Sequence, residues 1–462
     1  MPHLLYIFIT RLVFVGRACA QLFPLADIWP SGPGQALTPQ LADTELTQIL
    51  SQIDPRRIQA IVTKLVSFGT RHTLSNQTDP SRGIGAARDW IASEMQTYAA
   101  VSNGRMMVTV PSYVQVPAGS IPKNTVISNV IATLKGSKEP NRAYVISGHY
   151  DSRVSDIMNF SDDAPGANDD ASGVAVSMEL ARIMATHSPA ATIIFAAVAG
   201  EEQNLYGSNF LATQLKSAGV DVQGMLDNDI IGSSTADDGM KAPFDLRMFA
   251  QGIPPTETAS QITSRVSIGG ENDAPARQLG RFVTEVSQNF LTNMSVHMIY
   301  RPDRYLRGGD HLSFLKQGFP AVRFTEPHEN FAHQHQDVVV RNGVQFGDLI
   351  EFCDFDFIAR VAGVNAAALW SLAQAPGTPK NVVLDTSVLT NNSTLRWTRD
   401  TNADAGYEIV WRATDEPFWS HAIPVGLTSS STVSLSKDNV YFGVRAVGRN
   451  GFKSPASFPF SG

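Results

Sequence analysis

The sequence is poor in cysteine and has little excess charge of either sign. Its 462 residues include two cysteines, Cys19 and Cys353, which are too few for a disulfide-built scaffold or a thiolate zinc cluster. A net charge of -7, from 36 basic and 43 acidic residues, provides no basic stripe, so we expect no nucleic-acid partner. The length and the 43% hydrophobic content predict a globular protein with a large core and more than one domain. A metal site would need imidazole and carboxylate ligands.

Long apolar runs are absent after the first 20 residues. Residues 1–20 form an apolar segment ending in Ala-Cys-Ala, which predicts a secretory signal peptide. Arg11 interrupts this segment, so a buried N-terminal helix is the alternative. Because no second run is long enough to span a bilayer, we expect a secreted, extracellular protein with no membrane anchor. Glycosylation sequons that would accompany export lie at Asn76, Asn159, Asn293, Asn391 and Asn392.

Residue patterns divide the remaining chain into two domains. Residues 21–44 are rich in Pro and Gly and predict a lead-in arm or a pro-segment. Over 45–374, amphipathic helical patterns alternate with continuous apolar strands, which indicates an α/β domain with a mixed, mostly parallel sheet covered by helices on both faces. A Pro/Gly linker at 375–381 precedes short strands over 382–462, which predict a small all-β sandwich.

The last domain resembles a fibronectin type III module. The resemblance rests on Trp397, on GYEIVWR at 406–412 and on YFGVRAVGRNG at 441–451. Nothing in this region indicates chemistry.

Carboxylates and imidazoles follow four successive elements of the α/β domain. They are His149 and Asp151, Asp169 and Asp170, Glu201 and Glu202, and Asp229. In an open parallel sheet, ligands bind where strands end. Because like charges resist ionising together unless a cation lies between them, this crowding predicts a metal site.

Each motif has a simpler explanation when it is taken alone. The His149–Asp151 motif could hold a structural histidine, Asp169-Asp170 could cap a helix, and Asp229 could form a turn. Glu201-Glu202 is harder to explain, since charges at the end of a buried strand need partners. The combination is what indicates the site.

The order of the motifs resembles peptidase family twenty-eight, the co-catalytic di-zinc aminopeptidases. The matching segments are HxDS (149–152), GxNDDASG (166–173), GEExxxxGS (200–208), DIIG (229–232), GDHxxF (309–314) and HxxxD (333–337). The resemblance spans about residues 60–370, and the trailing β domain makes the chain similar to secreted fungal zinc metalloproteases. It implies a zinc aminopeptidase-like fold and a peptidase that acts on peptide or protein substrates with two zinc ions.

Five residues stand at the positions of the family's zinc ligands. In chain order they are His149, Asp169, Glu202, Asp229 and His333. The resemblance implies that His149 and Asp229 bind one zinc ion, that Glu202 and His333 bind the other, and that Asp169 bridges both. Three carboxylates and a bridging hydroxide would offset the charge of two zinc ions. Such ligands also accept manganese or cobalt, so zinc itself is implied by the resemblance.

The resemblance also implies roles for residues around the ligands. Glu201 would be the general base, and Asp151 would orient His149. His333 is preferred over its near rival His335 because it lies four residues before Asp337, as in the family pattern.

Three further residues are candidates for supporting roles. His311 in GDHxxF would support the pocket without binding metal. Tyr300 and Tyr305 could hydrogen-bond a developing oxyanion, although a buried structural tyrosine is the equal alternative.

Two other functions compete with the aminopeptidase. A glutaminyl cyclase uses a related scaffold with one zinc ion, but the NDDASG segment and the full ligand set argue against it. A non-catalytic binding or adhesion protein would act through the fibronectin-like domain, but such proteins usually lose a ligand or the base. The sequence leaves open exopeptidase or endopeptidase action, side-chain preference and oligomeric state.

Overall fold

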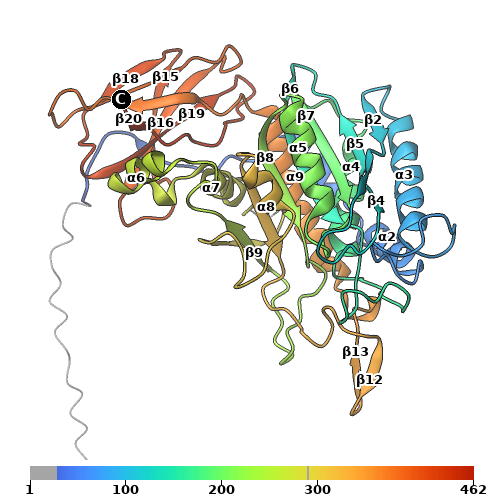
Figure 1. Cartoon of the computed structure of the whole chain (residues 1–462). Helices are drawn as coiled ribbons and strands as arrows, with labels where there is room; N and C mark the ends of the chain where they lie inside the picture. The colour runs from blue at the N-terminus through green and yellow to red at the C-terminus, as the bar shows by residue number, and fades with distance from the viewer. Residues whose placement is uncertain (1–28, 289–290) are drawn as a thin grey trace, which may run out of the picture.

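A mixed eight-stranded sheet forms the centre of the larger part of the molecule (Figure 1). The computed structural model describes residues 29–288 and 291–462, so the predicted signal peptide lies outside the described residues. The strand order is β10-β9-β11-β8-β6-β7-β5-β2. The strands are β2 (Met106–Thr109), β5 (Val130–Leu134), β6 (Glu139–His149), β7 (Ala191–Val198), β8 (Asp221–Asn228), β9 (Asp245–Ala250), β10 (Ser295–Ile299) and β11 (Ala321–Thr325). The central strands β7, β6, β8 and β11 run parallel, which confirms the predicted fold class.

Helices pack on both faces of the sheet, as predicted. Along β6, Tyr144 and Ile146 join the core on one face, whereas Ala143 and Val145 join the core on the other, because successive strand side chains point to opposite faces. The first core includes α1, α2, α3, α4, α7 and α9, and the second includes α5 and α8. These helices are α1 (Thr44–Ser51), α2 (Pro55–Val66), α3 (Ile84–Ala100), α4 (Ala171–Met184), α5 (Tyr206–Ser217), α7 (Pro275–Ser287), α8 (His311–Lys316) and α9 (Phe355–Gln374).

Aspartate caps begin two of the buried helices. The Asp170 carboxylate accepts a hydrogen bond from the Gly173 N–H at the start of α4, and Asp354 accepts one from the Phe357 N–H at the start of α9. Both contacts satisfy a backbone donor that the helix itself leaves free. Helix α9 is apolar nearly all round and lies inside the first core. Across the described ranges, no helix is both long and apolar enough to cross a membrane.

The C-terminal part contains two four-stranded sheets that share one core. One sheet has the order β1-β17-β16-β19 and the other β18-β15-β14-β20. Their strands are β1 (Gln35–Ala36), β14 (Lys380–Leu384), β15 (Ser393–Thr398), β16 (Gly406–Ala413), β17 (His421–Gly426), β18 (Ser430–Val433), β19 (Val440–Val447) and β20 (Phe460–Ser461). Leu395 and Trp397 from one sheet pack with Ile409 and Val444 from the other. The small β-sandwich is therefore confirmed, while its fibronectin type III type stays a prediction.

The lead-in arm supplies a strand to this sandwich. Strand β1 pairs antiparallel with β17, and the Trp411 Nε1–H donates to the Pro33 carbonyl oxygen at 2.8 Å. The arm therefore packs on the C-terminal domain, a contact that the sequence pattern did not predict. Whether it is removed as a pro-segment stays a prediction.

The sandwich is fixed to the α/β domain by buried charges. Asp273, just before α7, lies 3.0 Å from Arg281 of α7 and 2.6 Å from Arg412 of β16, and all three side chains are buried. Arg445 of β19 adds a pair with Glu285 at 3.1 Å. The short helices α6 (Ala259–Ser267) and η1 (Gly270–Asn272) precede α7, and α6 lies beside the sandwich in Figure 1. The predicted linker is thus accompanied by a packed interface between the two domains.

Small elements lie around the α/β domain. Two hairpins pair β3 with β4 and β12 with β13, and a short helix η2 precedes α9. These elements are β3 (Ser112–Gln115), β4 (Thr125–Ser128), β12 (Val339–Arg341), β13 (Val344–Phe346) and η2 (Ile350–Phe352). The β12–β13 hairpin projects from the molecule in Figure 1.

Candidate metal centre

The carboxyl ends of the central strands bring five polar residues together. His149 ends β6, Glu202 follows β7 and Asp229 follows β8. Asp169 lies just before α4, and His335 lies in the loop after β11. Because β7, β6, β8 and β11 are parallel neighbours, their ends meet at one edge of the sheet, as predicted.

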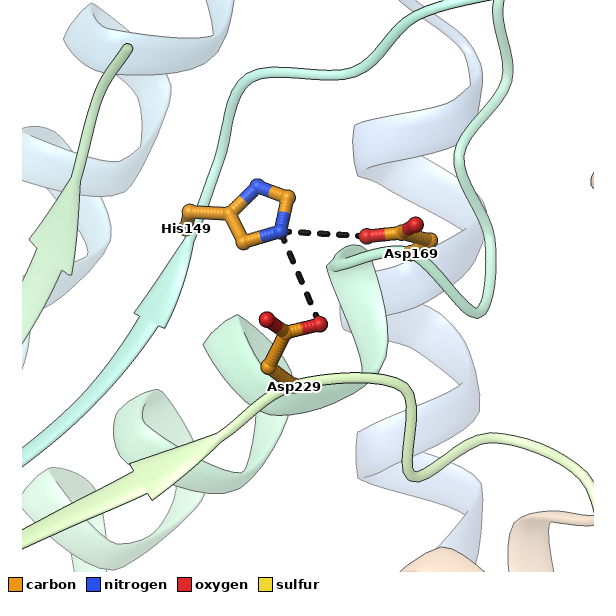
Figure 2. A group of neighbouring side chains, drawn as sticks. All are labelled: His149, Asp169 and Asp229. Atoms are coloured by element: carbon orange, nitrogen blue, oxygen red, sulfur yellow. Dashed lines mark ion pairs between the residues drawn. The ribbon is translucent and has the colours of Figure 1, made fainter. Parts of the chain in front are cut away.

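The five side chains form two groups that share Asp169. In the first group, the His149 Nε2 lies 3.0 Å from the Asp169 Oδ1 and 3.9 Å from the Asp229 Oδ1 (Figure 2). In the second, the His335 Nε2 lies 2.9 Å from both the Asp169 Oδ2 and the Glu202 Oε1. The ligand atoms within each group lie within 4.8 Å of one another. Asp169 therefore offers one oxygen to each group, which is the arrangement that a bridging carboxylate requires.

The clustered nitrogen and oxygen atoms are better suited to binding divalent cations than to hydrogen-bonding with one another. The His149 Nε2 and the Glu202 Oε1 are buried and have no hydrogen-bond partner in the described part of the chain. Their close contacts lack the alignment of a hydrogen bond, so the atoms converge without satisfying each other. A buried polar atom without a partner costs free energy, and a cation between the atoms would remove this cost. Imidazole nitrogen and carboxylate oxygen are suitable zinc ligands.

The electrostatics of the site also favour added positive charge. Burial alone would lower the pKa of His149, but Asp151, Asp169 and Asp229 together raise it well above its usual value. Burial likewise opposes protonation of His335, yet Glu202 and Asp169 raise its pKa to about 10. The surrounding carboxylates thus make positive charge favourable at both positions.

Asp151 contacts the clustered residues through both its backbone and its side chain. The His149 Nδ1 lies 3.1 Å from the Asp151 carbonyl oxygen and 3.6 Å from its Oδ1. An Nδ1–H that donates to this carbonyl leaves the Nε2 free for a metal. The carboxylate accepts hydrogen bonds from the backbone N–H groups of Glu201 and Glu202 at 3.3 and 3.2 Å. Asp151 therefore orients three residues of the site, chiefly through contacts other than the predicted carboxylate–imidazole pair.

His335, and not His333, is the histidine of the second group. The His333 ring stacks on Phe352 with ring centroids 3.5 Å apart and takes no part in either group. The choice of His333 from its spacing to Asp337 is therefore corrected. The backbone at His335 has a φ of 52°, in the left-handed region that non-glycine residues seldom adopt. Sequence spacing does not reveal this conformation.

Glu201 lies beside Glu202 in a partly buried position. Burial raises the pKa of the Glu201 carboxyl well above its usual value; His149 opposes this shift, and Asp229 and Glu202 reinforce it. The side chain belongs to neither ligand group. It therefore has the neighbours expected of a base that acts near the ligands without joining them.

The other predicted residues lie outside the two ligand groups. The His311 Nδ1 lies 3.2 Å from the Asp227 Oδ2, and its Nε2 lies 2.8 Å from the Pro302 carbonyl oxygen, so this buried ring holds the loop before α8. Tyr300 packs against Arg277, and Tyr305 packs against Arg301. Neither tyrosine hydroxyl hydrogen-bonds to a clustered residue within residues 29–288 and 291–462, so their oxyanion role stays a prediction.

The sequons lie mainly on the surface. Asn76, Asn293, Asn391 and Asn392 are exposed, whereas Asn159 is half-buried and donates to the Asp162 carboxylate. Glycosylation at these positions stays a prediction.

Three residues near the cluster were missed by the sequence analysis. Arg323 is fully buried and lies 3.0 Å from the Asp229 Oδ2. It also pairs with Asp303 at 2.7 Å. Both carboxylate oxygens of Asp310 are buried with no hydrogen-bond partner among the described residues. An available signal was the single charge inside the apolar strand PAVRF, since a buried charge needs a partner.

The sheet and the two ligand groups at its edge are typical of metal-dependent hydrolases. The sequence profile described as Peptidase family M28 matches residues 129–342. A "Probable zinc metalloprotease" of Pyricularia oryzae is 60% identical over 441 residues, covering 94% of this chain and 88% of the relative. Another, of Pyrenophora teres f. teres, is 58% identical over 434 residues, covering 93% and 90%. The chain belongs to peptidase family M28.

A solved structure supports the same fold. The Legionella pneumophila LapA aminopeptidase matches with a TM-score of 0.52 at 16% identity, covering 74% of this chain and 78% of that chain. Similarity at this level of identity concerns the fold alone.

Proposed function

We propose that this zinc metallopeptidase of family M28 is a secreted aminopeptidase that uses two zinc ions. The proposal depends chiefly on one observation: Asp169 offers one carboxylate oxygen to each of two imidazole–carboxylate groups. His149 and Asp229 would hold one ion, and Glu202 and His335 would hold the other. Bound there, the ions would supply the Lewis acidity that acidifies a water and polarises a scissile carbonyl.

The chain's own groups would then move the protons. Glu201 would accept a proton from the attacking water and donate it to the leaving amine. A raised pKa of Glu201 suits a group that must both accept and release a proton. Asp151 would fix the backbone positions of Glu201 and Glu202, because its carboxylate accepts hydrogen bonds from both backbone N–H groups.

Substrate cleavage with and without zinc tests this function. Purified protein is incubated with amino-acid p-nitroanilides and with their N-acetylated counterparts, before and after chelation and zinc return. We expect cleavage of the free-amine substrates only, lost on chelation and restored by zinc. Cleavage of the N-blocked substrates would contradict aminopeptidase action.

The same assay separates the alternatives. Conversion of an N-terminal glutamine peptide to pyroglutamate would favour a glutaminyl cyclase. Absence of any turnover in zinc-loaded protein would favour the binding or adhesion function. Secretion is tested by locating the protein in the culture medium and sequencing its N-terminus, which should lie after residue 20.

A further inference from the structure

Arg323 is a buried charge in the middle of a core strand. All five residues of β11 are buried, and the Arg323 side chain is completely inaccessible. Its guanidinium contacts two carboxylates, the Asp229 Oδ2 at 3.0 Å and the Asp303 Oδ2 at 2.7 Å. It also donates to the Gly308 carbonyl oxygen at 2.7 Å. A planar guanidinium with fixed donor directions is suited to holding several acceptors at defined angles.

The two carboxylate oxygens of Asp229 have different neighbours because Arg323 contacts only one of them. The Asp229 Oδ2 faces Arg323, while the Asp229 Oδ1 faces the His149 Nε2. The loop before α8 closes on this pair, since a Cβ at Gly309 would lie 3.3 Å from the Asp229 Oδ2 and 3.2 Å from the Arg323 Cδ. Rotation of the carboxylate would therefore break an ion pair in a packed environment. Asp229 thus directs its Oδ1 toward the His149 Nε2 while Arg323 holds its Oδ2.

Asp303 offsets the charge of Arg323. Burial would raise the pKa of Asp303, but Arg323, His311 and Arg304 lower it below its usual range, so this carboxylate stays ionised. Asp303 also pairs with Arg304 at 3.0 Å, and Arg304 in turn pairs with Glu329 at 2.9 Å, so each of these two guanidinium groups has a carboxylate beside it. Repulsion between the guanidinium and a nearby cation is correspondingly weakened, and orientation of Asp229 becomes the main effect of Arg323.

The second ligand group has no such arrangement. Among the described residues, the ion pair of Glu202 is with the ligand His335 alone, and no arginine lies against its carboxylate. The two groups therefore differ in how their terminal carboxylates are held.

We propose that Arg323 is a positioning residue that fixes Asp229 as a one-oxygen ligand and so selectively strengthens cation binding at the His149–Asp229 group. This inference rests on the proposed two-zinc function. Contacts that orient a ligand are worth on the order of 10- to 100-fold in metal affinity. Loss of Arg323 should therefore weaken one zinc site by that factor and leave the Glu202–His335 site unchanged.

Zinc titration of variants tests the proposal. Zinc per chain is measured by elemental analysis over a series of buffered free-zinc concentrations, for wild type, Arg323→Met and Arg323→Lys. Wild type should fill two zinc sites. Arg323→Met should fill the Glu202–His335 site at the same free-zinc concentration as wild type. It should fill the His149–Asp229 site only at about 10- to 100-fold higher free zinc. Arg323→Lys keeps the charge without the fork-shaped donor set and should lose less.

The controls separate orientation from folding. Arg323→Met removes one of the two arginines that pair with Asp303. The double variant Asp303→Asn with Arg323→Met also removes the charge of that carboxylate, and it provides a second test if the single variant does not fold. Arg281→Met removes a comparably buried arginine at the domain interface and should shift thermal unfolding without moving either zinc affinity. Unfolding of the zinc-free variants is measured in parallel.

The outcomes distinguish this inference from the proposed function. Wild-type protein that fills fewer than two sites would refute the two-zinc function. The role of Arg323 alone would be refuted by a different result. In that case wild type fills two sites, and both zinc affinities are unchanged or increased in Arg323→Met and in the double variant.

Discussion

Two buried clusters of charge in this protein differ in what their carboxylate oxygens face. At the domain interface, Asp273 lies between Arg281 and Arg412, and both of its carboxylate oxygens have a partner. At the edge of the sheet, three carboxylates and two imidazoles converge, and the His149 Nε2 and Glu202 Oε1 lack hydrogen-bond partners within the described chain. Each carboxylate oxygen of Asp273 faces a guanidinium, whereas the carboxylates at the edge of the sheet converge with too little positive charge nearby to offset them. The comparison separates a structural cluster from a functional one.

The largest expected effect comes from removing the residue that the two ligand groups share. Asp169→Ala should reduce bound zinc from two ions to at most one and abolish peptidase activity, because each group loses an oxygen. Elemental analysis and p-nitroanilide turnover measure both effects. Two tightly held ions in this variant would contradict the bridging role.

Glu201 tests whether chemistry can be separated from metal binding. Glu201→Gln should keep both zinc ions and lower kcat by about 10²- to 10⁴-fold, the usual contribution of a general acid–base group. Steady-state kinetics with parallel zinc analysis measures the change, and Glu202→Gln is the matched control that should lose zinc. Near-normal turnover by Glu201→Gln would show that the base lies elsewhere.

His335 and His333 provide a matched pair of variants. His335→Ala should lose one zinc ion and most activity, whereas His333→Ala removes only a ring stacked on Phe352 and should retain both ions. Zinc content and activity are measured on both variants together. The reverse result would restore His333 as the ligand.

The interface cluster should affect stability and leave the metal centre intact. Asp273→Ala leaves two buried guanidinium groups without their carboxylate, so we expect a loss of about 3–5 kcal/mol in the free energy of unfolding. Denaturant unfolding measures this loss, and zinc analysis of the folded variant should still give two ions. Zinc loss from folded Asp273→Ala would mean that the two clusters are not independent.

The sequence was informative where local pattern determines position. Apolar strands alternating with amphipathic helices predicted the parallel centre of the sheet, and parallel strands bring His149 and Asp229 to one edge. The local pattern did not predict which of the two neighbouring histidines joins the cluster. The spacing to Asp337 favoured His333, but its ring stacks on Phe352, and His335 is the histidine that reaches the cluster.

Contacts between distant segments were also beyond the sequence pattern. Gln35 and Ala36 pair with β17 nearly 400 residues later along the chain, and Asp273 meets Arg412 across the domain boundary. Arg323 was visible as a charge in an apolar strand, but its partners Asp229 and Asp303 come from other elements. Such pairings depend on how the elements are arranged in space.

A crystal structure of the zinc-loaded protein, with anomalous diffraction recorded at the zinc edge, tests the metal centre most directly. We expect two anomalous peaks, one contacted by His149, Asp169 and Asp229 and the other by Asp169, Glu202 and His335. A single peak, or a second peak that Asp169 does not contact, would contradict the account.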